Sequence, residues 1–263
     1  MRLHRVLPLG LGALAVAACH EDKVTTSNPP ALAAVRYIHG MPDTISVDIR
    51  MLDQVSWTAF ANGLAFRGAT EYMPTEAKAR PIRVFPTSRD PSVTSKPFFD
   101  ETVTFEAGKR YTLMLTGTAG NRHFLVLNDD VPACNSDVAI RAVNAGGTAA
   151  GLDLLLTRLV ADPRPAAPLF SNITPMTASA YVSRAPDTGY VRILPTGFAA
   201  GDKALDSAAV PLPPAAEAGK RPAAGFTTAC SAYSAIAFPK SSGSQTAFAN
   251  PGVVFFLDRT PGL

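Results

Sequence analysis

Val35-Arg36-Tyr37-Ile38-His39 opens the first half of the chain, and a related stretch, Ile140-Arg141-Ala142-Val143-Asn144, opens the second. Four more blocks recur in the same order, with small shifts of register between them. They are Val47-Asp48-Ile49 with Leu152-Asp153-Leu154, Tyr72 with Tyr181, residues 82–87 with 191–196, and residues 106–110 with 217–221. Chance hardly supplies five matches in order, so the sequence predicts a duplicated structural unit.

Each block also predicts a local structure. Residues 35–39 and 47–49 nearly alternate in polarity and are rich in β-branched side chains, which favours strands. Residues 82–86 predict a strand that ends at a proline. Residues 106–110, Glu-Ala-Gly-Lys-Arg, predict a tight turn in which glycine takes a positive φ. Short strands at regular spacing predict an all-β fold of two tandem immunoglobulin-like β-sandwich modules, with roughly seven strands in each.

The expected organisation of the chain has four parts. Residues 1–18 are read as a signal peptide and residues 19–33 as a lipidated N-terminus with a flexible tether. Residues 34–132 are expected to form the first sandwich module, and residues 133–263 the second, divergent one. The tether is expected because residues 21–30 are polar and contain Thr, Ser, Asn and Pro.

The N-terminus has the three parts of a secretory signal. Arg2 and Arg5 are positive, residues 6–17 are mostly apolar, and Val-Ala-Ala-Cys at 16–19 resembles a lipoprotein signal peptidase site. The resemblance implies cleavage before Cys19 and lipid on that cysteine, so the partner expected there is a membrane. The apolar run is too short for the roughly 20 residues of a spanning helix. An ordinary cleaved signal with an incidental cysteine is the alternative.

The residues near the cleavage site also bear on location and partners. His20 is not the aspartate that hints at inner-membrane retention, so we expect the cell envelope, with a lipid anchor in the outer membrane if the source has one. The formal net charge is +3, and two of those positive charges lie in the predicted signal. The mature protein is therefore near neutral, and without a basic run it is not expected to bind nucleic acid.

The chain contains three cysteines. If lipid takes Cys19, then Cys134 and Cys230 remain as an even pair in an oxidising compartment, which predicts a disulfide. In the chain-entropy model such a bridge stabilises the fold by about 4–5 kcal/mol, less any strain. Two buried free thiols are the alternative. Two widely separated cysteines have no metal-ligand spacing, so we expect no metal there.

The first repeat carries a family resemblance. Residues 35–43, followed by Val47-Asp48-Ile49, resemble the opening of the DUF4397 family, which is a hydrophobic strand, then His-Ala-Ser-Pro-Asp, then a Val-Asp-Val strand. The second half departs from that pattern, because Asn144 stands in place of His39 and Asp43 has no equivalent. The resemblance implies exported, β-rich envelope proteins, often with repeated modules, and it implies no established activity.

His39, Asp43 and Asp48 form the best polar cluster that the sequence offers. One hypothesis is a metal or ligand site at a strand end. The other, which we favour, is a local turn in which Asp43 caps backbone N–H groups and His39 bonds to backbone. Asp48 is interpreted as a residue on the outward face of a strand. The nucleophile elbow, the P-loop and the His-Glu-x-x-His motif do not occur, so we assign no catalytic residue and no cofactor.

Other side chains are weaker candidates for binding. Trp57 lies in an irregular stretch with other aromatics and is either a stacking surface for a sugar or protein, or part of a core. The recurring pairs Arg36/Arg141 and Arg83/Arg192 are either a paired anion site or, as we favour, exposed strand positions. Residues 128–130, Asn-Asp-Asp, lack the regular ligand spacing of a calcium loop, so we expect a solvated turn.

The sequence therefore predicts a non-catalytic envelope lipoprotein that presents sandwich loops to a partner, which is a polysaccharide, peptidoglycan or another envelope protein. The alternative is a carbohydrate-active or metal-dependent enzyme centred on His39, Asp43 and Asp48. Convergence of these three side chains in one concave site would favour the enzyme.

Overall fold

The computed structural model describes residues 29–53, 62–146, 151–158, 167–199, 201–215, 219–242 and 246–262. The chain divides into two compact units, Met1–Pro30 and Ala31–Leu263, and the fold described below belongs to the second. Within the described ranges, no helix is long and apolar enough to cross a membrane.

The first half of this unit consists of two four-stranded sheets, β4-β1-β7-β8 and β3-β2-β5-β6. A one-turn helix, α1 (Pro91–Thr94), connects the last two strands of the second sheet. The strands are β1 (Leu32–His39), β2 (Ser46–Met51), β3 (Leu64–Ala65), β4 (Met73–Glu76), β5 (Ala79–Pro86), β6 (Phe99–Thr104), β7 (Arg110–Thr116) and β8 (His123–Asn128).

The second half repeats this arrangement with the sheets β12-β9-β16-β17 and β11-β10-β14-β15, and β13 also pairs with β9. Its strands are β9 (Val138–Asn144), β10 (Leu152–Thr157), β11 (Phe170–Ile173), β12 (Thr177–Ala178), β13 (Val182–Arg184), β14 (Tyr190–Pro195), β15 (Asp206–Ala209), β16 (Ala232–Phe238) and β17 (Gly252–Arg259). A short 3-10 helix (Thr246–Phe248) precedes β17. The prediction of an all-β sandwich fold is confirmed.

The repeat is visible in strand pairing and in turns. β1 pairs parallel to β7 in the first half, and β9 pairs parallel to β16 in the second. The two Glu-Ala-Gly-Lys-Arg blocks place Gly108 at φ 74° and Gly219 at φ 76°, as a turn glycine requires. β5 and β14 both end at the proline that the sequence indicated.

Each half has its own apolar core between its two sheets. In the first, Val35 and Tyr37 of β1 point into that core, and in the second Ile140 of β9 does so. Because successive side chains of a strand point to opposite faces, Arg36 and Ile38 lie on the other face of β1. That face is buried as well, with both residues at most 3% exposed.

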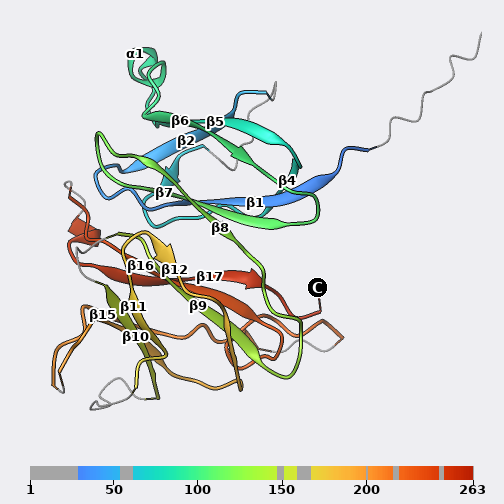
Figure 1. Ribbon diagram of the computed structural model, residues 1–263, viewed down its shortest axis with the longest axis vertical. Coiled ribbons are helices and arrows are strands. Elements are labelled where there is room, and N and C mark those ends of the chain that lie inside the picture. The colour runs from blue at the N-terminus through green and yellow to red at the C-terminus, as the bar shows by residue number, and fades with distance from the viewer. Residues whose placement is uncertain are drawn as a thin grey trace, which may run out of the picture. The chain divides into compact units, whose positions relative to one another are not determined.

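What covers this second face is the other half of the molecule. A third apolar cluster joins Ile38, Met114 and Leu127 of the first half to Val143 and Ile236 of the second. Four sheets are therefore stacked, with the sheet of β1 and β7 next to the sheet of β16 and β17 (Figure 1). β1 and β9 are therefore central strands that are buried on both faces.

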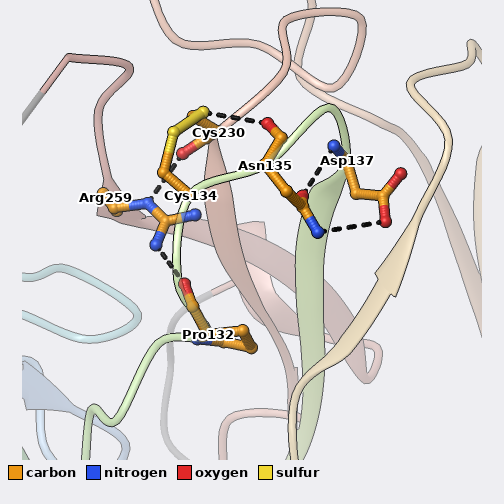
Figure 2. The surroundings of a disulfide bond; sticks show 6 residues. All are labelled: Pro132, Cys134, Asn135, Asp137, Cys230 and Arg259. Atoms are coloured by element: carbon orange, nitrogen blue, oxygen red, sulfur yellow. Dashed lines mark hydrogen bonds between the residues drawn. A yellow bond between two sulfur atoms is a disulfide. The ribbon is translucent and has the colours of Figure 1, made fainter.

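The predicted disulfide between Cys134 and Cys230 is present, with a Cα–Cα distance of 4.8 Å. It joins the connector before β9 to the segment before β16. Arg259 of β17 lies beside it and donates hydrogen bonds to the carbonyl oxygens of Cys230 and Pro132 (Figure 2). The disulfide and Arg259 together hold the connector that precedes β9 against the second half.

Candidate functional site

The recurring arginines are buried between the two halves. Arg36, which is 3% exposed, ion-pairs with Asp258 at the end of β17. Its Nε donates to the Oγ1 of Thr112 at 2.7 Å, and its Nη1 donates to the carbonyl oxygen of Leu257 at 2.8 Å. A single guanidinium of the first half is thereby tied to a carboxylate and a carbonyl of the second.

An arginine of the second half makes the equivalent set of bonds to the first half. Arg141, also 3% exposed, ion-pairs with Asp129, which directly follows β8. Its Nε donates to the Oγ of Ser234 at 2.8 Å, and its Nη1 donates to the carbonyl oxygen of Asn128 at 3.1 Å. The interface is thus self-complementary, as in a two-fold symmetric dimer, although one chain supplies both partners.

The repeated tyrosines complete this network. Tyr72 donates its hydroxyl to the Oδ2 of Asp129 at 2.7 Å, and Tyr181 donates to the Oδ2 of Asp258 at 2.9 Å. Each ring also lies against the guanidinium of the arginine in its own half, at 4.7 Å and 4.8 Å from the ring centroid. Two arginines, two aspartates and two tyrosines therefore form a charge-neutral, buried cluster.

Burial governs the pKa values in the cluster. It raises the pKa of Asp258 even though Arg36 and Arg141 both oppose it. It also raises the pKa of Tyr72 and Tyr181 well above the ordinary value for tyrosine. Burial by itself lowers the pKa of Arg36. The carboxylates that face the guanidinium raise this pKa by more, so the net shift is upward. Arginine and tyrosine groups shifted in this direction keep their protons near neutral pH. The ion pairs and hydrogen bonds of the cluster cross-link the two halves.

The network overturns two expectations from the sequence. Arg36 and Arg141 are not exposed strand positions, because a second sheet covers the face of the strand from which they project. Residues 128–130 are not simply a solvated turn, because Asp129 is 4% exposed and accepts hydrogen bonds from both halves. Asn128 and Asp130 do bond to each other at the surface.

The second arginine pair behaves differently in the two halves. The side chain of Arg83 is 35% exposed and pairs with Asp100 at 3.1 Å. Arg192 is 7% exposed, and its Nε donates to the Oγ1 of Thr157 at 3.1 Å. The expectation of exposed positions is therefore wrong for Arg192.

His39 is fully buried at the end of β1. Its Nδ1 accepts a hydrogen bond from the N–H of Met41 at 3.2 Å, and its ring lies edge-on to that of Phe66. Burial lowers the pKa of His39 to about 4, against smaller effects of Thr44 and Asp43, so the ring is neutral near pH 7. It holds a backbone turn in place.

Asn144 is the counterpart of His39 in the second half and also accepts a hydrogen bond from the backbone two residues on. Its Oδ1 accepts from the N–H of Gly146 at 3.0 Å, as His39 accepts from Met41. The departure from the family pattern at this position is therefore a substitution of one hydrogen-bond acceptor for another.

Asp43 joins two loops of the first half. Its Oδ2 accepts from the N–H of Ala119 at 2.9 Å and from Arg122 at 2.8 Å, and its Oδ1 accepts from Thr44 at 3.1 Å. Burial alone would raise the pKa of Asp43, but these hydrogen bonds outweigh it and hold the pKa below its usual value. The carboxylate fastens the β1–β2 loop to the β7–β8 turn.

Asp48 and its repeat partner Asp153 fasten neighbouring strands. Asp48 accepts from the N–H of Gly63 and the hydroxyl of Thr87, both at 2.7 Å. Asp153 accepts from the N–H of Asn172 at 2.7 Å and from the hydroxyl of Thr196 at 3.2 Å. The recurrence of Asp48 thus reflects a repeated structural hydrogen bond and not merely an outward-facing position.

His39, Asp43 and Asp48 each form hydrogen bonds with different partners. Among the described residues, no group of three or more His, Cys, Asp or Glu side chains is arranged to hold a metal ion. Trp57 and Cys19 lie outside the described residues.

A cleft of about 240 Å³ opens where loops of the two halves meet. Most of its lining comes from residues after β1 and β7 and from residues after β9 and β16, their repeat counterparts; His123 of β8 and Met176 before β12 complete it. The lining residues are Pro42, Gly117, Thr118, Asn121, His123, Ala145, Gly146, Met176 and Pro239. The sequence did not point to this cleft, because it depends on how the two halves pack together.

Comparisons with known proteins agree with the resemblance noted above. Residues 33–155 match the model of a family described as a domain of unknown function, DUF4397. No curated protein matches the sequence.

Solved structures resemble the chain weakly. One is described as α-glucan recognition by family 41 carbohydrate-binding modules from streptococcal virulence factors; it is 13% identical, with a TM-score of 0.22, and the match covers 66% of this chain and 85% of that one. Another, α-glucan binding by a streptococcal virulence factor, is 15% identical, with a TM-score of 0.20, and the match covers 66% and 84%. At these TM-scores neither structure bears on what this chain binds.

Proposed function

We propose that this chain, which carries a DUF4397 match, is a non-catalytic lipoprotein of the cell envelope that binds a partner with the loop end of a double sandwich. The observation that carries the proposal is the convergence of repeat-equivalent loops around one cleft. Each half supplies part of the lining, so the cleft exists only when the halves are packed together.

The direction of the strands supports a role in presentation. The chain enters the folded unit at Ala31, and β1 runs from Leu32 to His39 toward the cleft end. An eight-residue strand spans roughly 26 Å at about 3.3 Å per residue. With lipid on Cys19, the loop end would lie on the far side of the sandwich from the point where the tether joins it.

The alternative enzyme is less well supported. His39, Asp43 and Asp48 would be its catalytic groups, and each already holds a backbone segment in place. Their bonds favour a structural role for all three and leave presentation of the loops as the better proposal.

Binding at the loop end can be tested with two matched variants. Thr118 is exposed on the turn after β7, whereas Ala107 is exposed on the turn before it, at the opposite end of the strand. The mature protein is screened on a glycan array and against purified envelope proteins, and each ligand found is retested with Thr118→Tyr and Ala107→Tyr. We expect Thr118→Tyr to weaken binding at least tenfold and Ala107→Tyr to leave it unchanged. Equal loss in both variants, or in neither, would count against a site at the loop end.

The anchor is tested separately. Replacing Cys19 with serine in the full precursor removes the acylated thiol. We expect the wild-type protein in the membrane fraction and the Cys19→Ser variant in the soluble fraction. Membrane association that persists in the variant would overturn the lipid anchor without affecting the binding proposal.

A further inference from the structure

The two-fold relation between the halves continues into the loops. Arg67 and Met176 each stand five residues before the repeated tyrosine, and both have a positive φ, 64° and 62°. The N–H of Arg67 donates to the carbonyl of His39 at 2.8 Å, and the N–H of Met176 donates to that of Asn144 at 2.9 Å. Met176 is therefore the structural counterpart of Arg67.

Arg67 reaches across the interface into the second half. Its Nη2 donates to the carbonyl oxygens of Pro239 at 2.8 Å and of Asn250 at 2.7 Å. Its guanidinium lies 4.9 Å from the ring centroid of Phe248 and 5.9 Å from that of Phe238. The loops at this position thus form a seat for a guanidinium, built mainly of carbonyl oxygens and aromatic faces.

The cleft is the counterpart of this seat. Pro239 directly follows β16 as Gly117 directly follows β7, and Asn250 precedes β17 by two residues as Asn121 precedes β8. Gly117, Asn121 and Met176 all line the cleft. On the one side of the pseudo-two-fold axis an arginine of the chain fills the space between the loops. On the other side a shorter, uncharged methionine leaves the cleft of about 240 Å³.

We propose that the cleft binds the guanidinium of an arginine side chain from a protein partner, through loop carbonyl oxygens that correspond to those that accept hydrogen bonds from Arg67. Among the described residues, the phenylalanine rings beside Arg67 have no counterpart in the lining of the cleft. The proposal rests on the proposed function and names the chemistry of its partner. Backbone carbonyl oxygens accept hydrogen bonds and cannot donate them, so they favour a ligand rich in donors. The volume is below the roughly 300–1,000 Å³ of sites for drug-sized ligands and suits one side chain.

The charged groups beside the cleft do not oppose a cation strongly. Asp43 and Arg122 pair at 2.8 Å next to the lining turn and offset each other. His123 also lines the cleft, and its Nδ1 lies 3.2 Å from the carbonyl oxygen of Asn121. An incoming guanidinium would share that carbonyl, which has two lone pairs.

The test uses a charged probe and its neutral isostere. N-acetyl-arginine amide and N-acetyl-citrulline amide are titrated into the mature protein while amide resonances are followed by NMR. We expect the arginine derivative to shift the signals of Gly117, Asn121 and Gly146. The citrulline derivative should bind about tenfold more weakly, because hydrogen bonds from an ionised donor are roughly twice as strong as neutral ones.

Substitutions at the two counterpart positions make the test specific. Met176→Arg should place a guanidinium of the chain itself in the cleft and abolish binding of the probe, and Arg67 shows that arginine is accommodated at this φ. Met176→Leu, the matched control, should bind the probe as the wild type does. If Arg67→Met folds, it should create a second cleft and a second binding event.

The outcomes separate this inference from the proposed function. Equal binding of both probes, shifts away from the cleft, or unchanged binding by Met176→Arg would overturn the guanidinium site. If the Thr118→Tyr variant nevertheless loses a glycan or protein ligand, the loop end remains a binding site with a different chemistry. If the arginine probe does not bind in the cleft and Thr118→Tyr does not weaken binding of any ligand, both proposals are overturned.

Discussion

The guanidinium of Arg36 and the carboxylate of Asp258 form an ion pair across 222 residues of sequence, with side chains 3% and 0% exposed. Arg141 and Asp129 form the reciprocal pair, so each half of the molecule supplies one cation and one anion to the other. The two halves therefore meet through a self-complementary interface, as the subunits of a homodimer do. Because its charges are buried, a substitution that removes one member of an ion pair should destabilise the fold.

Arg36→Met should be strongly destabilising. It leaves the carboxylate of Asp258 buried without its cation, and breaking such a pair costs about 3–5 kcal/mol. The measurement is the free energy of unfolding from urea denaturation. Arg83→Met is the control, since its pair with Asp100 is partly exposed and should cost at most about 1 kcal/mol. A loss for Arg36→Met no larger than that of the control would contradict the role of the buried pair.

Tyr72→Phe and Tyr181→Phe should destabilise the protein by similar amounts. Each removes one hydroxyl that donates to a buried aspartate, at 2.7 Å and 2.9 Å respectively. The expected loss is about 1–3 kcal/mol per variant, measured by chemical denaturation. Losses that differ by more than about 2 kcal/mol would show that the two sides of the network are not energetically equivalent.

Removing the disulfide should lower stability without changing the fold. Cys134 and Cys230 are separated by 96 residues, and a loop of about this length is worth roughly 4–5 kcal/mol in the chain-entropy model. The Cys134→Ala/Cys230→Ala double variant should unfold at lower denaturant than the wild type while keeping its circular dichroism spectrum. Adding reductant should move the wild type toward the variant and leave the variant unchanged. Superimposable unfolding curves would refute a stabilising bridge.

His39 should make stability depend on pH in the mildly acidic range. Its pKa in the folded protein is about 4, below the ordinary 6.5, because burial disfavours the charged ring. The folded state therefore binds fewer protons than the unfolded state between these values. The contribution is complete above pH 6.5 and is lost as the pH falls from about 6.5 to about 4, with a maximum of about 3 kcal/mol.

His39→Asn is the variant that isolates this effect. Asn144 performs the equivalent hydrogen bond in the second half, so asparagine should preserve the turn while removing the titrating ring. Urea denaturation between pH 4 and pH 7 should show a shallower pH dependence for the variant. An unchanged slope would assign the acid sensitivity to other groups.

The sequence was a good guide wherever structure is local. Residues 35–39 and 140–144 repeat a pattern that specifies a strand, and the Glu-Ala-Gly-Lys-Arg block at 106–110 specifies a turn in which Gly108 has a positive φ. Pairing of Cys134 with Cys230 followed from counting the cysteines that lipid would leave. His39 bonds to the N–H of Met41 two residues on, in agreement with the favoured local turn. Asp43 bonds instead to Ala119 and Arg122 of the β7–β8 turn, which no local pattern indicates.

The interpretation of the recurring arginines was wrong for a physical reason. A polar residue between two apolar ones on a strand has the same pattern whether water or a second sheet lies over it. Arg36 is covered by the other half, and its counter-charge lies at the far end of the chain. The available signal was the joint recurrence of Arg36, Tyr72 and Asp129 with Arg141, Tyr181 and Asp258, since an unpaired charge cannot remain buried.

By itself, the sequence determined the strands, the turns, the duplication and the pairing of two cysteines, because these depend on side-chain periodicity, backbone preference and composition. Only the tertiary structure decided that the two halves share a core, that four of their charges are buried between them, and that one side of the interface is filled by Arg67 while the other opens beside Met176. Those features depend on which faces meet, and packing of one sheet against another is set by the whole folded surface and not by any local pattern.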